Sequence, residues 1–266
     1  MVTTHVAVQP VPGLHVPLTL VDLNNSTTTY NGLPRIFSDM DINQNHVKNL
    51  LAILMKHGLR EKIGIHRLHK HDDIPQEQVK LETRLETRPG KWIKPVPINS
   101  LDLNKIHPIV FKFVFELVTG ELHLRLDPYE FGEGPSPVSL CDVDNDCIRE
   151  AADYVNRNNL VDAIALELLD SARDEQAKES TAEVEVGKYG TIVLPKSMMI
   201  GGKLIPTGWP DINQPYDPEG EPPPGEHWNE AKKPDGAVTH KVHVDAVENE
   251  RELLNDLVRQ GVIIGA

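Results

Sequence analysis

The chain has 266 residues, of which 39% are hydrophobic and 25% are charged, so it can bury a sizeable core. Its formal net charge of −13 argues against the basic surface that non-specific binding to nucleic acid or anionic membranes requires. No apolar run reaches the roughly 20 residues of a membrane helix, and the first residues lack the pattern of a signal peptide. These features predict a cytoplasmic protein without nucleic-acid or membrane partners, and they leave its oligomeric state open.

The N-terminal region is predicted to run from an extended segment into a helix. Prolines within residues 5–23 bar both a helix and a central strand, so residues 1–35 are expected to be extended and to end in a turn. A helix then follows through Lys56, with Asp41 or Asn43 as its cap and an apolar stripe along one face.

Three short strands are predicted next, near residues 62–70, 78–87 and 91–98. The middle strand alternates apolar residues with Lys80, Glu82, Arg84 and Glu86. Alternation of this kind is typical of a sheet with one buried face and one face in water. We therefore expect these charged side chains to lie in solvent.

A β-hairpin is predicted over residues 109–127, with Thr119-Gly120 as a two-residue turn. This turn fixes which residues face each other. The expected apolar pairs are Phe113 with Leu126, Phe115 with Leu124 and Leu117 with Leu122, and the polar pairs are Glu116 with His123 and Lys112 with Asp127. Apolar packing and charge complementarity thus indicate the same register.

The C-terminal half is predicted to mix helices, strands and one long loop. In chain order we expect helices at 146–157 and 160–175, strands within 181–205, a Pro/Gly-rich lid or loop at 206–236, a strand at 238–244 and a helix at 248–260. Many strands are joined by hairpins rather than by helical crossovers. The expected class is therefore α+β, a single domain over residues 1–266 built on a mainly antiparallel sheet or open barrel with flanking helices.

Candidate chemistry is concentrated between His66 and Asp73, where three histidines and two aspartates occur; the chain has twelve histidines, about twice the usual share. In a strand, His69 and His71 would point to one face about 7 Å apart, close enough for both imidazoles to bind one metal ion. His66 would point to the opposite face unless the strand ends early. A polar strand end at the surface, without any ligand, would explain the same residues.

A metal site needs a third ligand, and the preferred candidate is His240, which begins a predicted strand directly after the long loop. Asp72 or Asp73 could be a further ligand or orient an imidazole. The alternatives to His240 are His123, His227 and His243. The expected ion is Zn, Fe or Cu.

Without a metal, His71 beside Asp72 or Asp73 would form a general acid–base pair. No nucleotide cofactor is expected, because neither a Walker loop nor a G-x-G-x-x-G turn occurs. The sequence thus favours an enzyme acting on a small, largely apolar molecule through a histidine-centred site, by oxygenase, hydrolase or lyase chemistry. The alternative is a non-catalytic interaction module that uses the acidic helices and the proline-rich loop.

Overall fold

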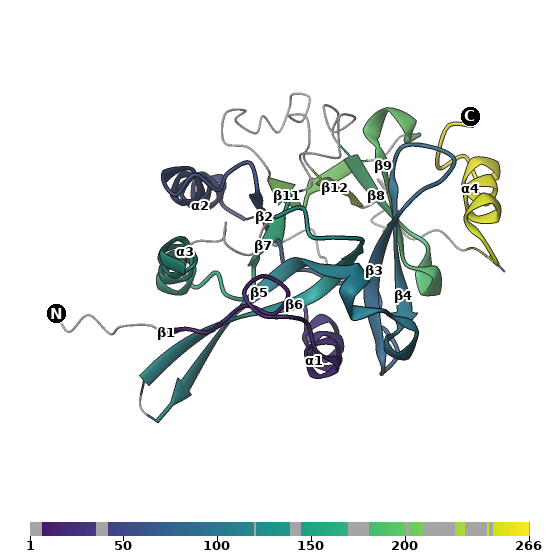
Figure 1. Ribbon diagram of the computed structural model, residues 1–266. Helices are drawn as coiled ribbons and strands as arrows, with labels where there is room; N and C mark the ends of the chain where they lie inside the picture. Colours follow the sequence, from purple (N-terminus) through teal and green to yellow (C-terminus); the bar gives the residue numbers. More distant parts are fainter. Residues whose placement is uncertain are drawn as a thin grey trace.

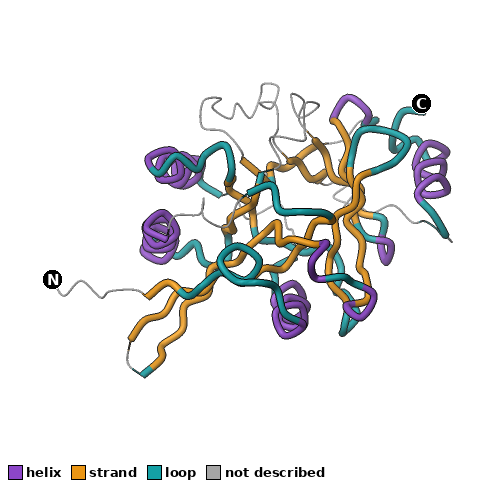
Figure 2. Tube along the Cα trace, viewed as in Figure 1, coloured by secondary structure: helices purple, strands orange, loops and turns teal. Residues whose placement is uncertain are grey.

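The computed structural model describes residues 7–35, 42–119, 121–138, 145–169, 181–200, 203–209, 227–231, 244 and 247–265. Within these ranges, α-helices surround one β-sheet (Figures 1 and 2). The helices are α1 (Leu20–Asn31), α2 (Gln44–Lys56), α3 (Asn145–Arg157) and α4 (Glu250–Arg259). The strands are β1 (Ala7–Val8), β2 (Ile63–Arg67), β3 (Gln78–Arg84), β4 (Lys91–Pro97), β5 (Ile106–Val118), β6 (Glu121–Glu133), β7 (Ile164–Leu168), β8 (Thr181–Glu185), β9 (Thr191–Pro195), β10 (Lys203–Pro206), β11 (Gly208–Trp209) and β12 (His227–Ala231).

The sheet is strongly curled. Its strand order is β10-β12-β8-β9-β4-β3-β6-β5-β7-β2-β11, and the two strands at the ends of this order are separated in the chain by Thr207 alone. The Arg67 N–H donates to the Thr207 carbonyl across 2.7 Å, which ties this connection to β2. The predicted α+β class is confirmed, but the sheet is mixed, because β3 pairs with β6 and β12 pairs with β8 in parallel.

The apolar side chains lie between the outer face of the sheet and the helices. Figure 1 shows α2 and α3 beside β2 and β7, α1 beside β5 and β6, and α4 on the far side. Ile65, Phe111 and Leu166 belong to the cluster that α2 and α3 cover, and Val184 and Ile192 belong to the cluster that α4 covers. The alternate side chains of the same strands therefore point into the concave interior of the sheet.

The polar face of β3 shows the consequence of this curling. Lys80 is 4% exposed and lies opposite Glu130 of β6, and the Glu82 side chain is only 20% exposed. The alternation in β3 was predicted correctly, and Arg84 and Glu86 are exposed as expected. For Lys80 and Glu82 the expectation that the charge lies in water is wrong. The sheet folds their face inward, because the helices already cover the other face.

Helix α1 replaces the extended segment and turn expected for residues 20–31. Thr19 caps the helix and forms a capping box with Asp22, and Leu23 and Tyr30 are buried. Asn, Ser and Thr have low helix propensity, which is why the sequence indicated a turn. Packing against β3 and β6 outweighs that propensity.

Several predicted elements are confirmed. Helix α2 has Asn43 as its N-cap, and α3 and α4 agree with the helices predicted at 146–157 and 248–260. The β5–β6 hairpin has the predicted register at all five pairs, although Gly120 lies outside the described residues. The charge partners differ: Arg125 contacts both Glu116 and Asp127, and Lys112 pairs with Asp162.

Other predictions for the C-terminal half are wrong or lie outside the described residues. Ile164–Leu168 is strand β7, where a helix over 160–175 was expected, and its five buried residues explain the misreading as an apolar helix. Two strands, β11 and β12, occur within the predicted loop at 206–236. Most of that loop, and the predicted strand at 238–244 apart from Val244, lie outside the described residues.

Candidate metal centre

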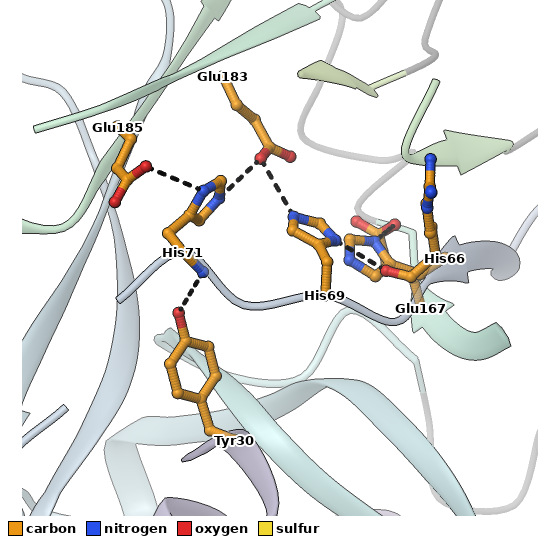
Figure 3. Close-up of polar contacts among 8 residues, drawn as sticks. Tyr30, His66, His69, His71, Glu167, Glu183 and Glu185 are labelled. Carbon is orange, nitrogen blue, oxygen red and sulfur yellow. Dashed lines mark hydrogen bonds and ion pairs between the residues drawn. The ribbon is translucent and has the colours of Figure 1, made fainter. Parts of the chain in front are cut away.

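The three neighbouring histidines lie together because β2 ends at Arg67. His66 points into the interior from β2, and His69 and His71 follow in irregular chain. The His66 and His69 rings stack with centroids 5.3 Å apart, and the His69 and His71 rings meet edge to face at 5.1 Å (Figure 3). His66 was expected to point away from the other two unless the strand ends early, and the end of β2 at Arg67 is that exception.

Glu183 on β8 completes a cluster with His69 and His71, which we call the ligand cluster. Its Oε2 atom lies 3.6 Å from Nε2 of His69 and 3.3 Å from Nε2 of His71. One ligand atom from each residue lies within 4.8 Å of the other two. All three side chains are at most 8% exposed. The group could hold a metal ion.

Both imidazoles are oriented so that Nε2 faces Glu183. Nδ1 of His69 donates to the Arg67 carbonyl at 2.8 Å, which leaves the lone pair of the neutral ring on Nε2. Nδ1 of His71 lies 3.7 Å from a carboxylate oxygen of Glu185, an electrostatic contact from the next inward position on β8. Acceptors behind the ligating histidines are a regular feature of metal sites.

The ionisation states suit a metal site. Burial lowers the pKa of His71 to about 4, so the ring is neutral at pH 7. Burial raises the pKa of Glu183, but hydrogen bonds and charge from His69 and His71 outweigh it and hold the pKa well below its usual value. At neutral pH the ligand cluster thus presents a neutral imidazole and a carboxylate, the forms that bind metal ions.

A second His–Glu pair lies beside the ligand cluster. Nδ1 of His66 contacts Oε2 of Glu167 on β7 at 3.2 Å. Burial lowers the pKa of His66, but Glu167 outweighs it through a hydrogen bond and its charge, and the net pKa is raised. Glu130 also faces this region, and burial raises its pKa. The interior thus places two further titratable groups with raised pKa values, His66 and Glu130, beside the ligand cluster.

The remaining predicted site residues lie elsewhere. Asp73 is exposed and pairs with Lys70 at 2.7 Å, which lowers its pKa, and Asp72 is half-buried; neither aspartate is in the ligand cluster. His240 lies outside the described residues, as does His243. His123 lies on the β5–β6 hairpin, 4.0 Å from Glu121, and His227 begins β12.

Sequence reasoning did not identify Glu183 or Glu185. The only signal was the pattern Thr181–Glu185, in which Ala182 and Val184 alternate with the glutamates. Such a pattern normally describes a strand with one face in water. The sequence therefore offered no reason to place these carboxylates beside histidines more than 100 positions earlier.

The ligand cluster borders a small inner cavity of about 30 Å³. His66, Glu130 and Glu167 line the same space. This volume suits a metal ion with a bound water molecule, since one water occupies roughly 30 Å³ in the liquid. An organic molecule larger than a few atoms does not fit inside it.

The chain matches no protein-family model, no curated protein and no solved structure. Among the described helices, none has the length and apolar character needed to cross a membrane. The functional argument therefore rests on the geometry and chemistry of the ligand cluster and its surroundings.

Proposed function

We propose that this protein is a metal-dependent enzyme whose divalent ion is bound by His69, His71 and Glu183. The observation that carries the proposal is the convergence of two Nε2 atoms on one buried carboxylate oxygen, at 3.6 and 3.3 Å. A metal ion placed between these atoms would be bound by both rings and by the carboxylate, in place of the hydrogen bonds that His69 and His71 make to Glu183.

The distances favour a tetrahedral ion such as zinc. Two ligands bonded at about 2.1 Å lie about 3.4 Å apart at a tetrahedral angle, and about 3.0 Å apart at a right angle. The observed 3.3 and 3.6 Å are nearer the first value. Zinc is also bound readily by imidazole and carboxylate groups together.

A catalytic role requires that the ion keeps a position for water or substrate. Structural zinc sites usually have four protein ligands, whereas catalytic sites keep a position for water or substrate. The ligand cluster supplies three protein ligands among the described residues. A metal ion held there would lower the pKa of bound water towards 7 and generate a nucleophile.

Glu130 supports chemistry based on activated water. It lines the inner cavity, and burial raises its pKa above the usual value, which makes its carboxylate a stronger base. A carboxylate beside metal-bound water is suited to accept its proton. Hydrolysis, or the addition and removal of water, is therefore the reaction class that we propose.

Metal content tests the proposal directly. Protein purified without an affinity tag or chelator is expected to contain nearly one equivalent of a transition metal by mass spectrometry. His69→Ala and Glu183→Gln should each lower the affinity at least 10-fold, measured by chelator competition, because each removes a direct ligand.

His123→Ala is the matched control, since it removes a histidine from the hairpin and should retain full metal content. Circular dichroism would establish that each variant is folded. Wild-type protein that binds neither zinc nor another divalent transition metal on titration would refute the proposal, as would ligand variants with wild-type affinity.

A further inference from the structure

A second cavity adjoins the ligand cluster and has the size of a substrate site. This outer chamber has a volume of about 220 Å³ and shares Glu82 and Ile109 with the inner cavity. The inner cavity, at about 30 Å³, is too small for an organic substrate. A substrate that reaches the proposed metal ion would therefore have most of its atoms in the outer chamber.

Another hollow is larger but lies elsewhere. It measures about 390 Å³ and lies between the start of α1 and the β3–β4 region, lined by Leu20, Gln78 and Ile98 among others. It shares no residue with the inner cavity. This hollow has the larger volume. We nevertheless take the outer chamber as the candidate substrate site, because it shares lining residues with the inner cavity and this hollow does not.

Two cations stand opposite each other in the wall of the outer chamber. Arg84 of β3 faces Lys91 of β4 directly in the sheet register, and both line the chamber. Like charges directly opposite each other destabilise a strand pair. Glu82 offsets part of that cost at Lys91, and the guanidinium group of Arg84 can bind a carboxylate through two parallel hydrogen bonds.

The Glu82 carboxylate shows that Lys91 can bind a carboxylate at this place. Its Oε1 atom lies 3.0 Å from Nζ of Lys91, and both side chains are 20% exposed. Glu82 lines both cavities. Glu133, the other acidic residue of the wall, is exposed.

The part of the wall formed by β5 and β6, where Gly132 pairs with Glu82 of β3, is closely packed around His107. Its Nδ1 donates to the Gly134 carbonyl at 3.0 Å, which fixes the ring against β6. A Cβ atom at Gly132 would lie 2.8 Å from Cε1 of His107 and 2.9 Å from Cδ1 of Ile109, both residues of the chamber wall. Any side chain at position 132 would therefore push this wall into the chamber.

We propose that the outer chamber binds a small carboxylate-bearing molecule, the substrate of the metal centre, with its carboxylate held by Arg84 and Lys91. This inference rests on the proposed metal-dependent function. It replaces the largely apolar substrate expected from the sequence with a polar, anionic one, since charged side chains and His107 form much of the wall.

Calorimetric titration of the zinc-loaded protein tests the inference. The probes are succinate and glutarate, each compared with its neutral diamide. We expect at least one dicarboxylate to bind saturably and at least 10-fold more tightly than its diamide. Arg84→Gln should weaken that binding about 10-fold or more, because a charge-assisted hydrogen bond is lost.

Gly132→Ala is the second variant, and it should abolish carboxylate binding while zinc affinity is unchanged, since it fills the chamber and not the ligand cluster. Arg259→Gln on α4 is the matched control, because this arginine pairs with Asp256 at the surface. Its carboxylate affinity should equal that of the wild type.

The outcomes separate the two proposals. Absence of binding both of zinc and of every other divalent transition metal would refute the metal-dependent function. Zinc-loaded protein that binds neither dicarboxylate, that binds the diamides equally well, or that is unaffected by Arg84→Gln would overturn the carboxylate inference alone.

Discussion

Three histidines within six residues differ in what their ring nitrogens face. Nε2 of His69 and of His71 face Glu183, while Nδ1 of His66 faces Glu167. The difference arises from the backbone, because His66 is the last interior residue of β2 and the other two follow the end of that strand. Residue type does not distinguish the three histidines. Their different surroundings follow from the local course of the backbone.

Glu185 is expected to position His71 for metal binding. Glu185→Gln removes the negative charge 3.7 Å from Nδ1 of His71 with little change in side-chain volume. Metal affinity should fall about 10-fold, as is usual when a group behind a ligating histidine is lost. Chelator competition measures the change, and Glu121→Gln on the exposed hairpin is the control. Unchanged affinity in Glu185→Gln would contradict this role.

At the level of elements, helices α2 and α3 are connected by a small charged network as well as by apolar packing. Glu150 of α3 contacts Nζ of Lys56 at 2.7 Å and Nε2 of His57 at 2.9 Å, at the C-terminal end of α2. Hydrogen bonds from Lys56 and His57 lower the pKa of Glu150. The network lies on the outer side of the sheet, where the apolar stripe of α2 was predicted correctly.

The lowered pKa of Glu150 determines how its contribution to the free energy of unfolding depends on pH. A carboxyl group with a lowered pKa in the folded state stabilises the protein above its unfolded pKa of about 4.3, and this contribution is lost as pH falls through the folded pKa. Glu150→Gln should therefore lower the free energy of unfolding at pH 7, by less than about 1 kcal/mol because solvent screens the group. Urea unfolding from pH 7 to about pH 3 should show the difference narrowing; a difference that widens would contradict the argument.

At the level of the whole molecule, the curled sheet encloses charged side chains and carries its apolar side chains on the outer face. Apolar clusters lie outside the sheet under the helices, while Lys80, Glu183 and Glu185 are at most 5% exposed inside it. Buried charges are costly unless they are paired or bound to an ion. The interior is therefore the part of the fold that gains most from a bound cation.

Metal removal is expected to destabilise the whole fold, because the proposed ligands come from the segment after β2 and from β8, far apart in the chain. Zinc at 100 times its dissociation constant should add about 2.7 kcal/mol to the free energy of unfolding. For a chain of this size the melting temperature should rise by roughly 5–10 °C. Scanning calorimetry with zinc and with chelator measures the shift. His123→Ala should show the same shift, and His69→Ala should show at most about half of it, because its affinity is at least 10-fold lower.

The sequence by itself determined the elements whose signals are local. The apolar stripe and cap of α2, the register of the β5–β6 hairpin and the alternation in β3 are properties of short stretches, and the structure agrees with each. The sequence also indicated His69 and His71 as candidate ligands. Local signals failed for α1 and β7, where packing outweighed helix propensity and a buried apolar run resembled a helix.

Only the tertiary structure decided which face of each strand is enclosed. Alternation of apolar and polar residues along a strand shows that the strand has two different faces. It does not show whether the polar face lies in water or in an enclosed polar interior, because both environments accept polar side chains. The curling of the sheet turned the charged faces of β3 and β8 inward and brought Glu183 to His69 and His71. The third candidate ligand was therefore beyond local reasoning, since its position depends on long-range strand pairing and not on its neighbours in the chain.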